Sequence, residues 1–359
     1  MSWLHGKYLG SSLRDCLRVK TSDSYLSHLQ SPTRSSISNM APFKILIIGG
    51  GAAGIASAIA ISKAFSTQLE ITVFELRNQP GDIGGAVNLT PNALRCLDFL
   101  GVLDVLKTRK VGCEIKSIQV FSLHTGASLG TIDYNGDGNG FGGYRGRRVM
   151  RSELMKAMID VALKMGIQIE YDKKLTALHE TTQSVTVKFG DGTDVTGDLV
   201  LGCDGIHSAT RAQIEPARVP KYSGVSSAYG FAKSEEKMFF NDTALTMSRS
   251  GALLTTYCDD TRQRVYVAAM MESKGEISKE GWRAMGKDQE AIKENISKRF
   301  EKSVLPHMTH LVQNADEWFL FPVYILPPDG KWSTDRVILL GDSAHAVRQS
   351  PHHLTLLTL

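Results

Sequence analysis

Cysteine is scarce in this sequence of 359 residues, which has five thiols and no pair at the Cys-x-x-Cys spacing. An odd and scattered set disfavours both a disulfide framework and a structural zinc site, and it favours a reducing, intracellular setting. The thiols are Cys16, Cys96, Cys113, Cys203 and Cys258. We therefore expect a cytoplasmic protein without a metal centre.

An excess of either charge is also missing, because 41 Lys and Arg face 37 Asp and Glu, for a formal net charge of +4. So small an excess on a long chain does not predict a nucleic acid or an anionic membrane as partner. Hydrophobic residues at 42% and charged residues at 22% are typical of a globular protein. At about 150 residues per domain, the length allows about two domains.

Long apolar runs are absent too. The stretch from Ile45 to Ser62 carries no charge, but its clustered glycines make it a poor membrane helix, so we expect no transmembrane segment. Residues 1–40 lack the apolar core of a secretory signal and are rich in Ser, with more basic than acidic residues. We expect a disordered extension there, or an initiator at Met40; a mitochondrial transit peptide is the alternative.

A β-α-β pattern begins at Lys44. The segment Lys44–Ile48 predicts a buried strand, Ile55–Phe65 a helix of small residues and Ile71–Glu75 a second strand. Parallel strands joined in this way imply an α/β sheet that is covered on both faces.

The turn of this unit has the pattern Gly49-x-Gly51-x-x-Gly54, and Glu75 ends the following strand. Gly49 permits a tight turn, Gly51 lets backbone amides approach a pyrophosphate, and Gly54 lets the helix pack closely on the strand. An acidic residue at the place of Glu75 can bind ribose hydroxyls. The segment predicts dinucleotide binding, although the motif alone does not separate FAD from NAD, and a glycine turn used only for packing is the alternative.

The remaining elements are predicted from shorter patterns. Single helices are expected over Asn92–Leu106 and over Ser152–Met165, the latter with Ser152 as N-cap, and a mobile glycine-rich loop over 134–146. A hairpin is expected to pair Val185–Phe189 with Asp198–Cys203. Beyond these we expect antiparallel strands from Tyr222 to about Val267, a long helix carrying Ile292, Ile296 and Phe300 that Pro306 stops, and strands over Trp318–Leu326 and Arg336–Leu340.

Two buried strands run directly into acidic turns. The first ends in Asp204-Gly205, followed by His207 and Arg211, and the second ends in Gly341-Asp342. Open α/β sheets bind ligands at the carboxyl ends of their strands, so both carboxylates are candidate ligand-binding groups.

Together these motifs resemble the FAD-dependent aromatic hydroxylases of the para-hydroxybenzoate and salicylate hydroxylase type, particularly their fungal members, from about Phe43 to His345. The resemblance rests on the glycine motif with Glu75, Gly84-Gly-Ala-Val-Asn-Leu-Thr-Pro-Asn-Ala-Leu94, Arg148-Val-Met-Arg151-Ser-Glu-Leu154, Asp204-Gly205 and Gly341-Asp342. It implies an α/β fold: a Rossmann-like doubly wound FAD-binding sheet of the glutathione-reductase type and a mostly antiparallel substrate-binding domain. The implied FAD-binding domain comprises residues 41–212 with 331–359, and the substrate domain residues 213–330.

Roles for single residues follow from the resemblance. Glu75 would bind the adenosine ribose, the Gly85-Ala86 backbone would lie against the flavin, and Arg151 would contact the cofactor. Asp204-Gly205 with Arg211 would serve both FAD and NAD(P)H, and Gly341-Asp342 would bind the ribityl or pyrophosphate part of FAD. Arg151 also stands beside other arginines, Arg145, Arg147 and Arg148, which together form an anion-attracting patch; a solvated loop face is the favoured alternative for Arg145 and Arg147.

The resemblance also implies a reaction. NAD(P)H, with NADPH the expected form, would reduce FAD; O2 would form a flavin C4a-hydroperoxide, and one oxygen atom would pass to a small aromatic, typically phenolic, substrate. The antiparallel domain would form the lid and pocket that exclude water. Tyr229 or His207 is a weak candidate for helping the phenol to lose its proton, because a single Tyr in a strand is more often a core residue.

The similarity breaks after His345. Members of the family continue with a Gly-Gln-Gly turn and a helix whose N-terminus faces the flavin, and this chain continues differently. We therefore expect the chain as written to bind FAD poorly, and the adjacent His352 and His353 do not make a metal site. A non-catalytic nucleotide-binding remnant, another flavoenzyme of the same fold such as an epoxidase or halogenase, and an NAD-dependent dehydrogenase stay open as alternatives.

Overall fold

The computed structural model describes residues 41–65, 69–81, 84–234, 238–273, 275 and 277–346. By its internal contacts the chain divides into residues 1–41 and a compact unit of residues 42–359, and the description below concerns the second unit. The expected N-terminal extension and the segment after Ala346, with His352 and His353, lie outside the described residues.

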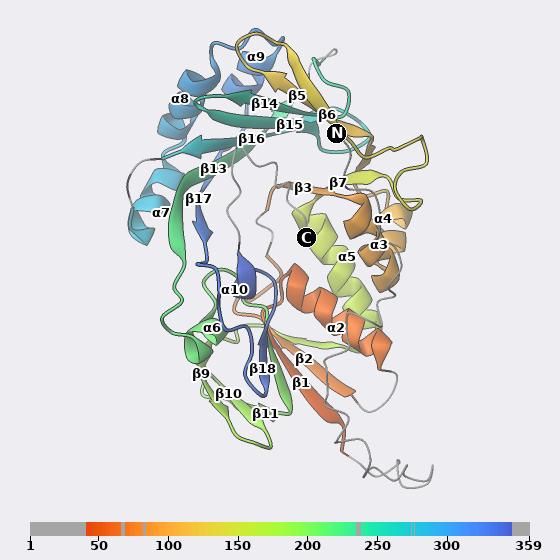
Figure 1. The fold of residues 1–359 in the computed structure, drawn as a ribbon, viewed down its shortest axis with the longest axis vertical. Helices are drawn as coiled ribbons and strands as arrows, with labels where there is room; N and C mark the ends of the chain where they lie inside the picture. Colours follow the sequence, from red (N-terminus) through yellow and green to blue (C-terminus); the bar gives the residue numbers. More distant parts are fainter. Residues whose placement is uncertain are drawn as a thin grey trace, which may run out of the picture. The chain divides into compact units, whose positions relative to one another are not determined.

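Five parallel strands form the nucleotide-binding type of sheet that the sequence predicts (Figure 1). In spatial order they are β18 (Val337–Leu339), β12 (Leu199–Gly202), β1 (Phe43–Ile48), β2 (Leu69–Phe74) and β8 (Gln168–Glu170). In β1 the last four residues, Ile45 to Ile48, are all buried, because both faces of the sheet are covered.

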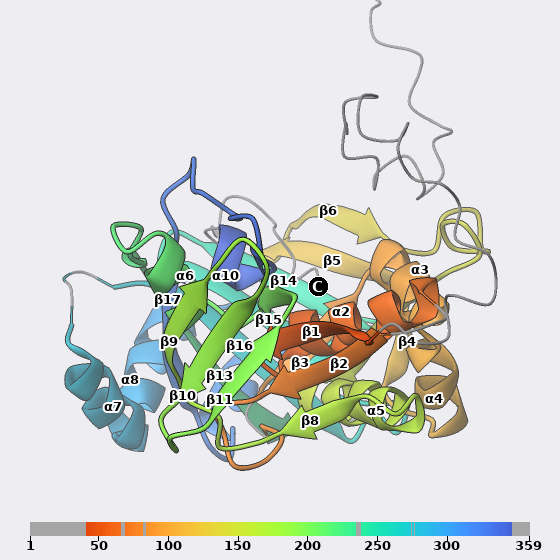
Figure 2. The same cartoon turned by 90° about the horizontal axis from the view of Figure 1, so that it is seen from below.

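The two faces of this sheet are covered differently. On one face, helices α2 (Ala52–Ala64) and α5 (Arg151–Lys164) pack side by side over Ile45 and Ile47. On the other, the antiparallel sheet of β9 (Leu175–Glu180), β10 (Val185–Phe189) and β11 (Asp194–Gly197) packs over Leu46 and Ile48 (Figure 2). The α/β class is confirmed, with a small β-sheet instead of helices as the second cover.

Three local predictions were wrong. The hairpin partner of β10 is β11, because Leu199–Gly202 pairs with β1 and thus belongs to the parallel sheet. The helix expected over 92–106 is split into α3 (Pro91–Leu100) and α4 (Val102–Thr108) by Gly101, whose φ of +79° is left-handed. Helix α5 is capped by Met150 rather than Ser152, without a side-chain hydrogen bond.

A seven-stranded sheet builds the second part of the unit. Its order is β17 (Phe319–Ile325), β13 (Lys221–Lys233), β16 (Arg264–Glu272), β15 (Gly251–Tyr257), β14 (Thr243–Ser248), β5 (Ser117–Ser122) and β6 (Ser128–Asp133). Only β14 and β5 pair in parallel, so the antiparallel prediction is confirmed for β13 to β17.

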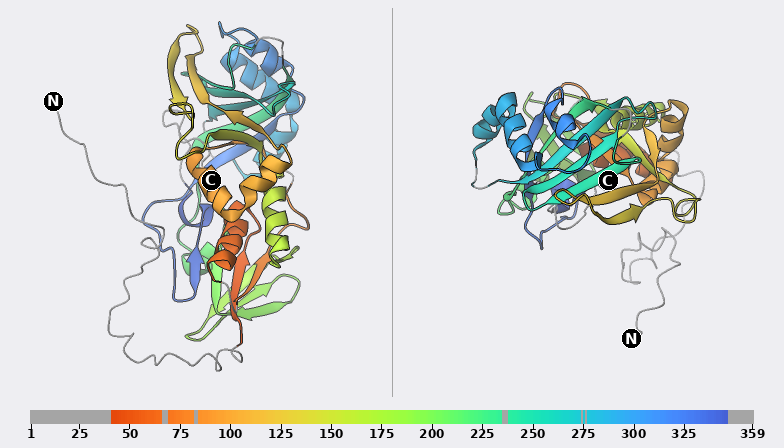
Figure 3. Two further views of the ribbon diagram at one scale, coloured as in Figure 1. Left: turned by 90° about the vertical axis from the view of Figure 1, so that its right-hand side faces the viewer. Right: turned by 90° about the horizontal axis from the view of Figure 1, so that it is seen from above.

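Helices cover one face of the large sheet (Figures 1 and 3). Helix α8 (Gln289–Phe300) inserts Ile292, Ile296 and Phe300 as expected and ends before Pro306. The neighbouring helices are α7 (Lys279–Lys287) and α9 (Met308–Gln313). The opposite face of the large sheet carries Tyr229 and Tyr266, which pack against Ala86 in the part of the unit that contains the parallel sheet, called the nucleotide-binding part below.

A small sheet links the two parts, with β7 (Gly146–Met150) between β3 (Ala86–Leu89) and β4 (Cys113–Ile115). The predicted boundaries assign all of residues 41–212 to the nucleotide-binding part, whereas β5 and β6 are strands of the large sheet. Among the described residues, no helix is long and apolar enough to cross a membrane.

Candidate functional site

The glycine and acidic motifs meet at one edge of the parallel sheet. Because β1, β2, β12 and β18 run in the same direction, the residues that follow them lie at the same edge. These residues are Gly49, Glu75, Asp204 and Gly341, from four separate stretches of the sequence. The structure thus brings together the predicted residues of the glycine motif and of the three acidic motifs.

The three motif glycines are required for different reasons. Gly49 has a φ of +110°, and a Cβ there would overlap the carbonyl of Cys203. A Cβ at Gly54 would overlap the carbonyl of Gly49, so this glycine permits close packing of α2 on the turn. A Cβ at Gly51, the N-cap of α2, would meet nothing within 4 Å. Gly51 therefore faces open space at the start of a 13-residue helix, where a phosphate group would find room and a favourable dipole.

Glu75 is tied to the same turn. Its Oε2 accepts a hydrogen bond from the Gly50 amide at 2.7 Å, and its Oε1 accepts one from the Arg77 amide at 3.1 Å. The side chain is only 12% exposed. A carboxylate can accept about four hydrogen bonds. Glu75 therefore keeps acceptor capacity for ribose hydroxyls while the turn holds it in place.

Asp204 organises the turn that follows β12. Its carboxylate accepts hydrogen bonds from the Ser208 hydroxyl at 2.5 Å and from the Thr210 amide at 2.9 Å. Ser208 in turn caps α6 (Ala209–Ile214). The intervening Gly205 has a φ of +77°, and a Cβ there would meet no atom within 4 Å. Asp204 thus shapes the loop, and the Gly205 backbone is what the loop leaves open to a ligand.

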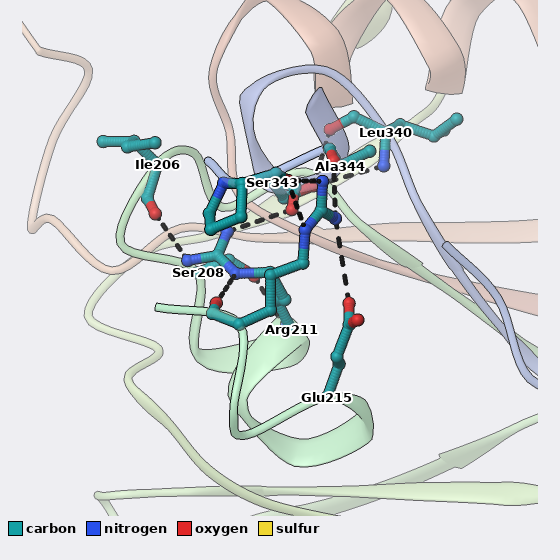
Figure 4. Close-up of polar contacts among 9 residues, drawn as sticks. Ile206, Ser208, Arg211, Glu215, Leu340, Ser343 and Ala344 are labelled. Atoms are coloured by element: carbon teal, nitrogen blue, oxygen red, sulfur yellow. Dashed lines mark hydrogen bonds and ion pairs between the residues drawn. The ribbon is translucent and has the colours of Figure 1, made fainter. Parts of the chain in front are cut away.

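Arg211 directs its guanidinium into the protein interior. The side chain is 2% exposed, and its guanidinium donates to the carbonyls of Ile206, Arg218 and Ser343 (Figure 4). Burial lowers its pKa, although the nearby Asp204 partly offsets this. The geometry gives Arg211 a bracing role between α6 and α10 (Asp342–His345), and a direct contact with FAD or NAD(P)H stays a prediction.

The Gly341-Asp342 turn is joined to both neighbouring strand ends. Gly341 has a φ of +65°, and its missing Cβ would lie 3.0 Å from Ala53 in α2. The Ser343 hydroxyl donates to the Gly202 carbonyl at the end of β12, at 2.5 Å. Asp342 is exposed, and its carboxylate has no hydrogen bond or ion pair within the described part of the chain. It is therefore available to a ligand, and its binding to FAD stays a prediction.

A second group of candidates lies where β3 begins. The Arg151 amide donates to the Gly85 carbonyl at 3.0 Å, and the aliphatic part of the Arg151 side chain packs against Gly84. A Cβ at Gly85 would overlap the phenol oxygen of Tyr266, from β16 of the large sheet. Ala86 is buried beside Tyr229 and Tyr266. Gly85, Ala86 and Arg151 thus stand at the junction of the two parts of the unit.

Tyr229 reaches this junction, and His207 does not. The phenol oxygen of Tyr229 is hydrogen-bonded by the Gly84 backbone, and burial raises its pKa although Arg151 lowers it. His207 packs instead against Tyr324, which pairs with Tyr222 at the beginning of β13. Seven residues of strand, roughly 23 Å, separate Tyr222 from Tyr229. The two weak catalytic candidates are therefore not neighbours.

Aromatic rings surround Tyr229 on the open face of the large sheet. Its ring stacks on Phe319 with centroids 5.0 Å apart, on Phe321 at 5.9 Å, and lies 5.4 Å from Tyr266. Such a surface suits a flat aromatic ligand and keeps water away from it. Tyr266 was missed by sequence reasoning, because a tyrosine in an alternating strand carries no sign of which face is open.

The predicted arginine patch is not a single surface. Arg147 and Arg148 point to opposite faces of β7: Arg147 donates to the Val111 carbonyl, whereas Arg148 is 1% exposed and faces the large sheet. Arg145 is 42% exposed and pairs with Glu114 at 3.4 Å. The period of two in a strand separates adjacent arginines that look alike in the sequence.

A pocket of about 330 Å³ opens between the turn after α4, the start of α5 and the large sheet. Its lining includes the basic residues Arg109, Lys110 and Arg264. Glu153 and Asp259 supply acidic groups to the same wall.

The residues at the sheet edge fit FAD. Gly51 and Gly205 leave open backbone at adjacent strand ends, Glu75 keeps free acceptor sites, and Asp342 has a free carboxylate. An extended dinucleotide would need such a row of small residues and acceptors to hold it.

Comparison with known proteins agrees with this geometry. The family model described as FAD binding domain matches residues 43–351. The 3-amino-4-hydroxybenzoate 2-monooxygenase PtmB3 of Streptomyces platensis is 28% identical over 311 residues, which cover 86% of this chain and 74% of that protein. The 3-hydroxybenzoate 6-hydroxylase of Klebsiella oxytoca is 23% identical over 316 residues, covering 85% of this chain and 74% of that protein.

A solved structure has the same fold. The crystal structure of Klebsiella pneumoniae HpxO complexed with FAD and uric acid superposes with a TM-score of 0.70 at 20% identity, covering 85% of this chain and 74% of that one. With the family model matching most of its length, this chain belongs to the family of FAD-dependent aromatic hydroxylases that share the FAD binding domain.

Proposed function

We propose that this protein is a monooxygenase that hydroxylates a small phenolic ring, with FAD as cofactor and NAD(P)H and O2 as co-substrates. The observation that carries the proposal is the meeting of Gly51, Glu75, Gly205 and Asp342 at one sheet edge, in a unit whose Gly84-Gly85 segment packs against Tyr229 and Tyr266. The relatives named above act on 3-amino-4-hydroxybenzoate and 3-hydroxybenzoate, which are hydroxylated aromatic rings.

A ring C–H becomes C–OH with one atom of O2, and the other oxygen atom leaves as water. NAD(P)H, with NADPH as the expected form, supplies two electrons and becomes NAD(P)+, and solvent supplies a proton. When bound, FAD supplies the electron transfer and the activation of O2.

The protein's own residues bind, orient and shield. The aliphatic part of Arg151 packs against Gly84, and its charge acts on the phenol of Tyr229, so it would favour an electron-rich cofactor ring bound at this junction. Tyr229, Phe319 and Tyr266 form an apolar wall that keeps water from the reacting atoms. Because burial raises the pKa of Tyr229, its phenol is neutral at neutral pH and can donate a hydrogen bond to a substrate oxygen. This makes Tyr229 a hydrogen-bond donor rather than a base.

The test is direct. The purified chain is titrated with FAD, following quenching of flavin fluorescence, so that even weak binding is measured. With FAD in excess, phenolic acids should accelerate NADPH oxidation, and 18O2 should label the product. Saturable FAD binding with no labelled product from any phenol would overturn the hydroxylase proposal; absence of any FAD binding would favour a nucleotide-binding remnant. Repeating the assay with NADH decides between the two reductants.

Tyr229→Phe tests the donor role. Losing one hydrogen bond to the substrate should lower kcat about tenfold. We also expect a larger share of NADPH to be spent on hydrogen peroxide instead of product, because the substrate is held less well. FAD affinity should change little, since Tyr229 is not one of the sheet-edge residues Gly51, Glu75, Gly205 and Asp342. An unchanged yield of product per NADPH would remove Tyr229 from the mechanism.

A further inference from the structure

Arg148 is a buried cation without a counterion. The residue is 1% exposed, and its Nε and Nη2 have no hydrogen-bond partner among the described residues. Burial lowers its pKa to about 10, which leaves it charged at neutral pH. The groups that act most on this charge are Tyr266, Cys113, Cys258 and Tyr134, and none of them is a carboxylate.

These neighbours do not balance the charge. Burial raises the pKa of both thiols to about 11 and that of Tyr134 to about 12, and it raises the pKa of Tyr266 as well. All four groups are therefore neutral at neutral pH. Because an unpaired buried charge is strongly destabilising, hydration of Arg148 would lower the free energy of this region.

Arg148 lies where the small sheet packs against the large sheet. On β7 it pairs with Asn88 of β3 and with Cys113 of β4, and residues paired across antiparallel strands share a face. Ala86, two residues before Asn88, is on the same face and packs against Tyr266 of the large sheet. Asn88 is 4% exposed, and its Oδ1 also lacks a partner within the described ranges. This interface therefore buries two polar groups that water would satisfy.

The same interface is closed in this structure. Tyr229 is 7% exposed and Tyr266 is 5% exposed. The 330 Å³ pocket described above is lined by neither of these side chains. A substrate ring therefore needs the two sheets to move apart before it can lie against Tyr229.

We propose that the small sheet of β3, β7 and β4 separates reversibly from the large sheet in the folded protein, and that hydration of the unpaired Arg148 favours the open form. Packing of Gly85 on Tyr266 favours the closed form. The interface is thus a gate with two opposing contributions. The inference rests on the proposed function only for the purpose of the gate, which is to admit the substrate.

Thiol labelling of the full chain, without FAD or substrate, measures the opening. Cys113 is buried beside Arg148 and does not line the pocket, so a thiol reagent reaches it only in the open form. Cys203 is buried in the core under α2 and α5 and becomes reactive when that core unfolds. Cys96 is exposed. Mass spectrometry of peptides follows each of the three thiols separately.

We expect Cys113 to be labelled at least about tenfold faster than Cys203 and Cys96 to react at once. The rate for Cys113 should also depend much less on urea, because partial opening exposes less surface than global unfolding does. The same urea dependence for Cys113 and Cys203 would overturn the proposal, since the reagent would then reach Cys113 only by global unfolding.

Two variants test the role of the charge. Arg148→Met removes it, and Asn88→Asp gives it a carboxylate partner on the neighbouring strand. Each should slow the labelling of Cys113 at least about tenfold, because the closed form no longer holds an unpaired charge. Asn88→Asp keeps the arginine, so its result stands even where methionine packs poorly.

The control is Arg145→Met, which removes an arginine that is 42% exposed and should leave the labelling rate of Cys113 unchanged. If neither Arg148→Met nor Asn88→Asp slows the labelling, the charge does not favour the open form and the proposal fails.

This experiment does not depend on the reaction. If the chain binds no FAD or hydroxylates no phenol, the proposed function fails, while the labelling of Cys113 still reports on the gate. If phenols are hydroxylated but Cys113 is labelled only on global unfolding, the gate alone fails.

Discussion

Two glycines of the same motif differ in what surrounds them. Gly49 is held at a positive φ against the Cys203 carbonyl, whereas Gly51 has ordinary backbone angles and open space beside it. The first glycine is therefore a requirement of folding, and the second is a requirement of ligand binding.

This difference predicts that the same substitution, glycine to alanine, has different effects at the two positions. Gly49→Ala should lower the free energy of unfolding by roughly 3 kcal/mol, from backbone strain and overlap with a carbonyl that cannot move away. Gly51→Ala should cost about 1 kcal/mol or less, the difference between two N-cap residues, but should weaken FAD binding. Urea denaturation and FAD titration of both variants check this. Equal losses of stability would contradict the distinction.

His207 predicts a dependence of stability on pH. Burial, followed by the charges of Lys279 and Arg211, lowers its pKa below the ordinary value. The unfolded chain then takes up a proton more readily than the folded chain as the pH falls below about 6.5. His207 therefore lowers the free energy of unfolding on the acid side and has no effect above that range.

The measurement is urea denaturation between about pH 5 and about pH 8. His207→Asn should reduce the loss of stability on the acid side, and His124→Asn, at an exposed histidine for which no such burial exists, should not. If the free energy of unfolding of His207→Asn falls with decreasing pH as steeply as that of the unmodified chain, this prediction is wrong.

At the level of elements, two arginine side chains join α6 and the turn after it to α10. Arg211 connects the loop after β12, the Arg218 carbonyl and the Ser343 carbonyl. Arg218 adds bonds from the same region to the carbonyls of Pro327 and Ala344. The position of the Asp342 turn thus depends on distant parts of the chain.

Arg211→Met should therefore cost roughly 3 kcal/mol of unfolding free energy, because three buried carbonyls lose a charged donor at once. FAD affinity should fall with it, since Gly205 and Asp342 lose their fixed separation. Arg283→Met, on the exposed side of α7, is the control and should change stability by about 0.5 kcal/mol or less. An unchanged free energy of unfolding for Arg211→Met would contradict this prediction and would mean that water molecules replace the arginine as donors to the three carbonyls.

For the whole molecule, the close approach of Gly85 and Tyr266 holds the nucleotide-binding part against the large sheet. Gly85→Ala should cost roughly 2 kcal/mol by overpacking. In a Tyr266→Ala background that cost should shrink by about 1 kcal/mol or more, because the clashing ring is gone. Tyr257→Ala lies on the opposite face of the sheet and serves as the control: its loss of unfolding free energy should simply add to that of Gly85→Ala. A double-mutant cycle of denaturation free energies measures both.

Local sequence patterns predicted the elements well wherever one short segment decides the outcome. The β-α-β unit, the strands from Tyr222 on and the apolar stripe of α8 follow from periodicity alone. The sheet edge was predictable because parallel strands place their following residues together. Glu75 and Asp342 could be located in this way.

The rest depends on distant partners. Leu199–Gly202 reads equally well as a hairpin strand and as a parallel strand, and only pairing with β1 decides between them. Arg211 and Arg148 look like surface cations because the carbonyls and thiols around them come from elsewhere in the sequence. Which face of β16 or β7 is open likewise depends on how the sheets pack, which no local pattern contains.

The outermost strand of the parallel sheet is supplied by a late part of the chain. β12 ends at Gly202, and its neighbour β18 starts at Val337, so the whole large sheet from β13 onward is synthesised between them. At 5–20 residues per second, a ribosome needs on the order of 10 seconds to cover that interval. During this time β12 is a bare strand edge, open to mispairing with other nascent chains. We therefore expect the nascent chain to need protection from aggregation, for example by a chaperone, until residue 339 has left the ribosome.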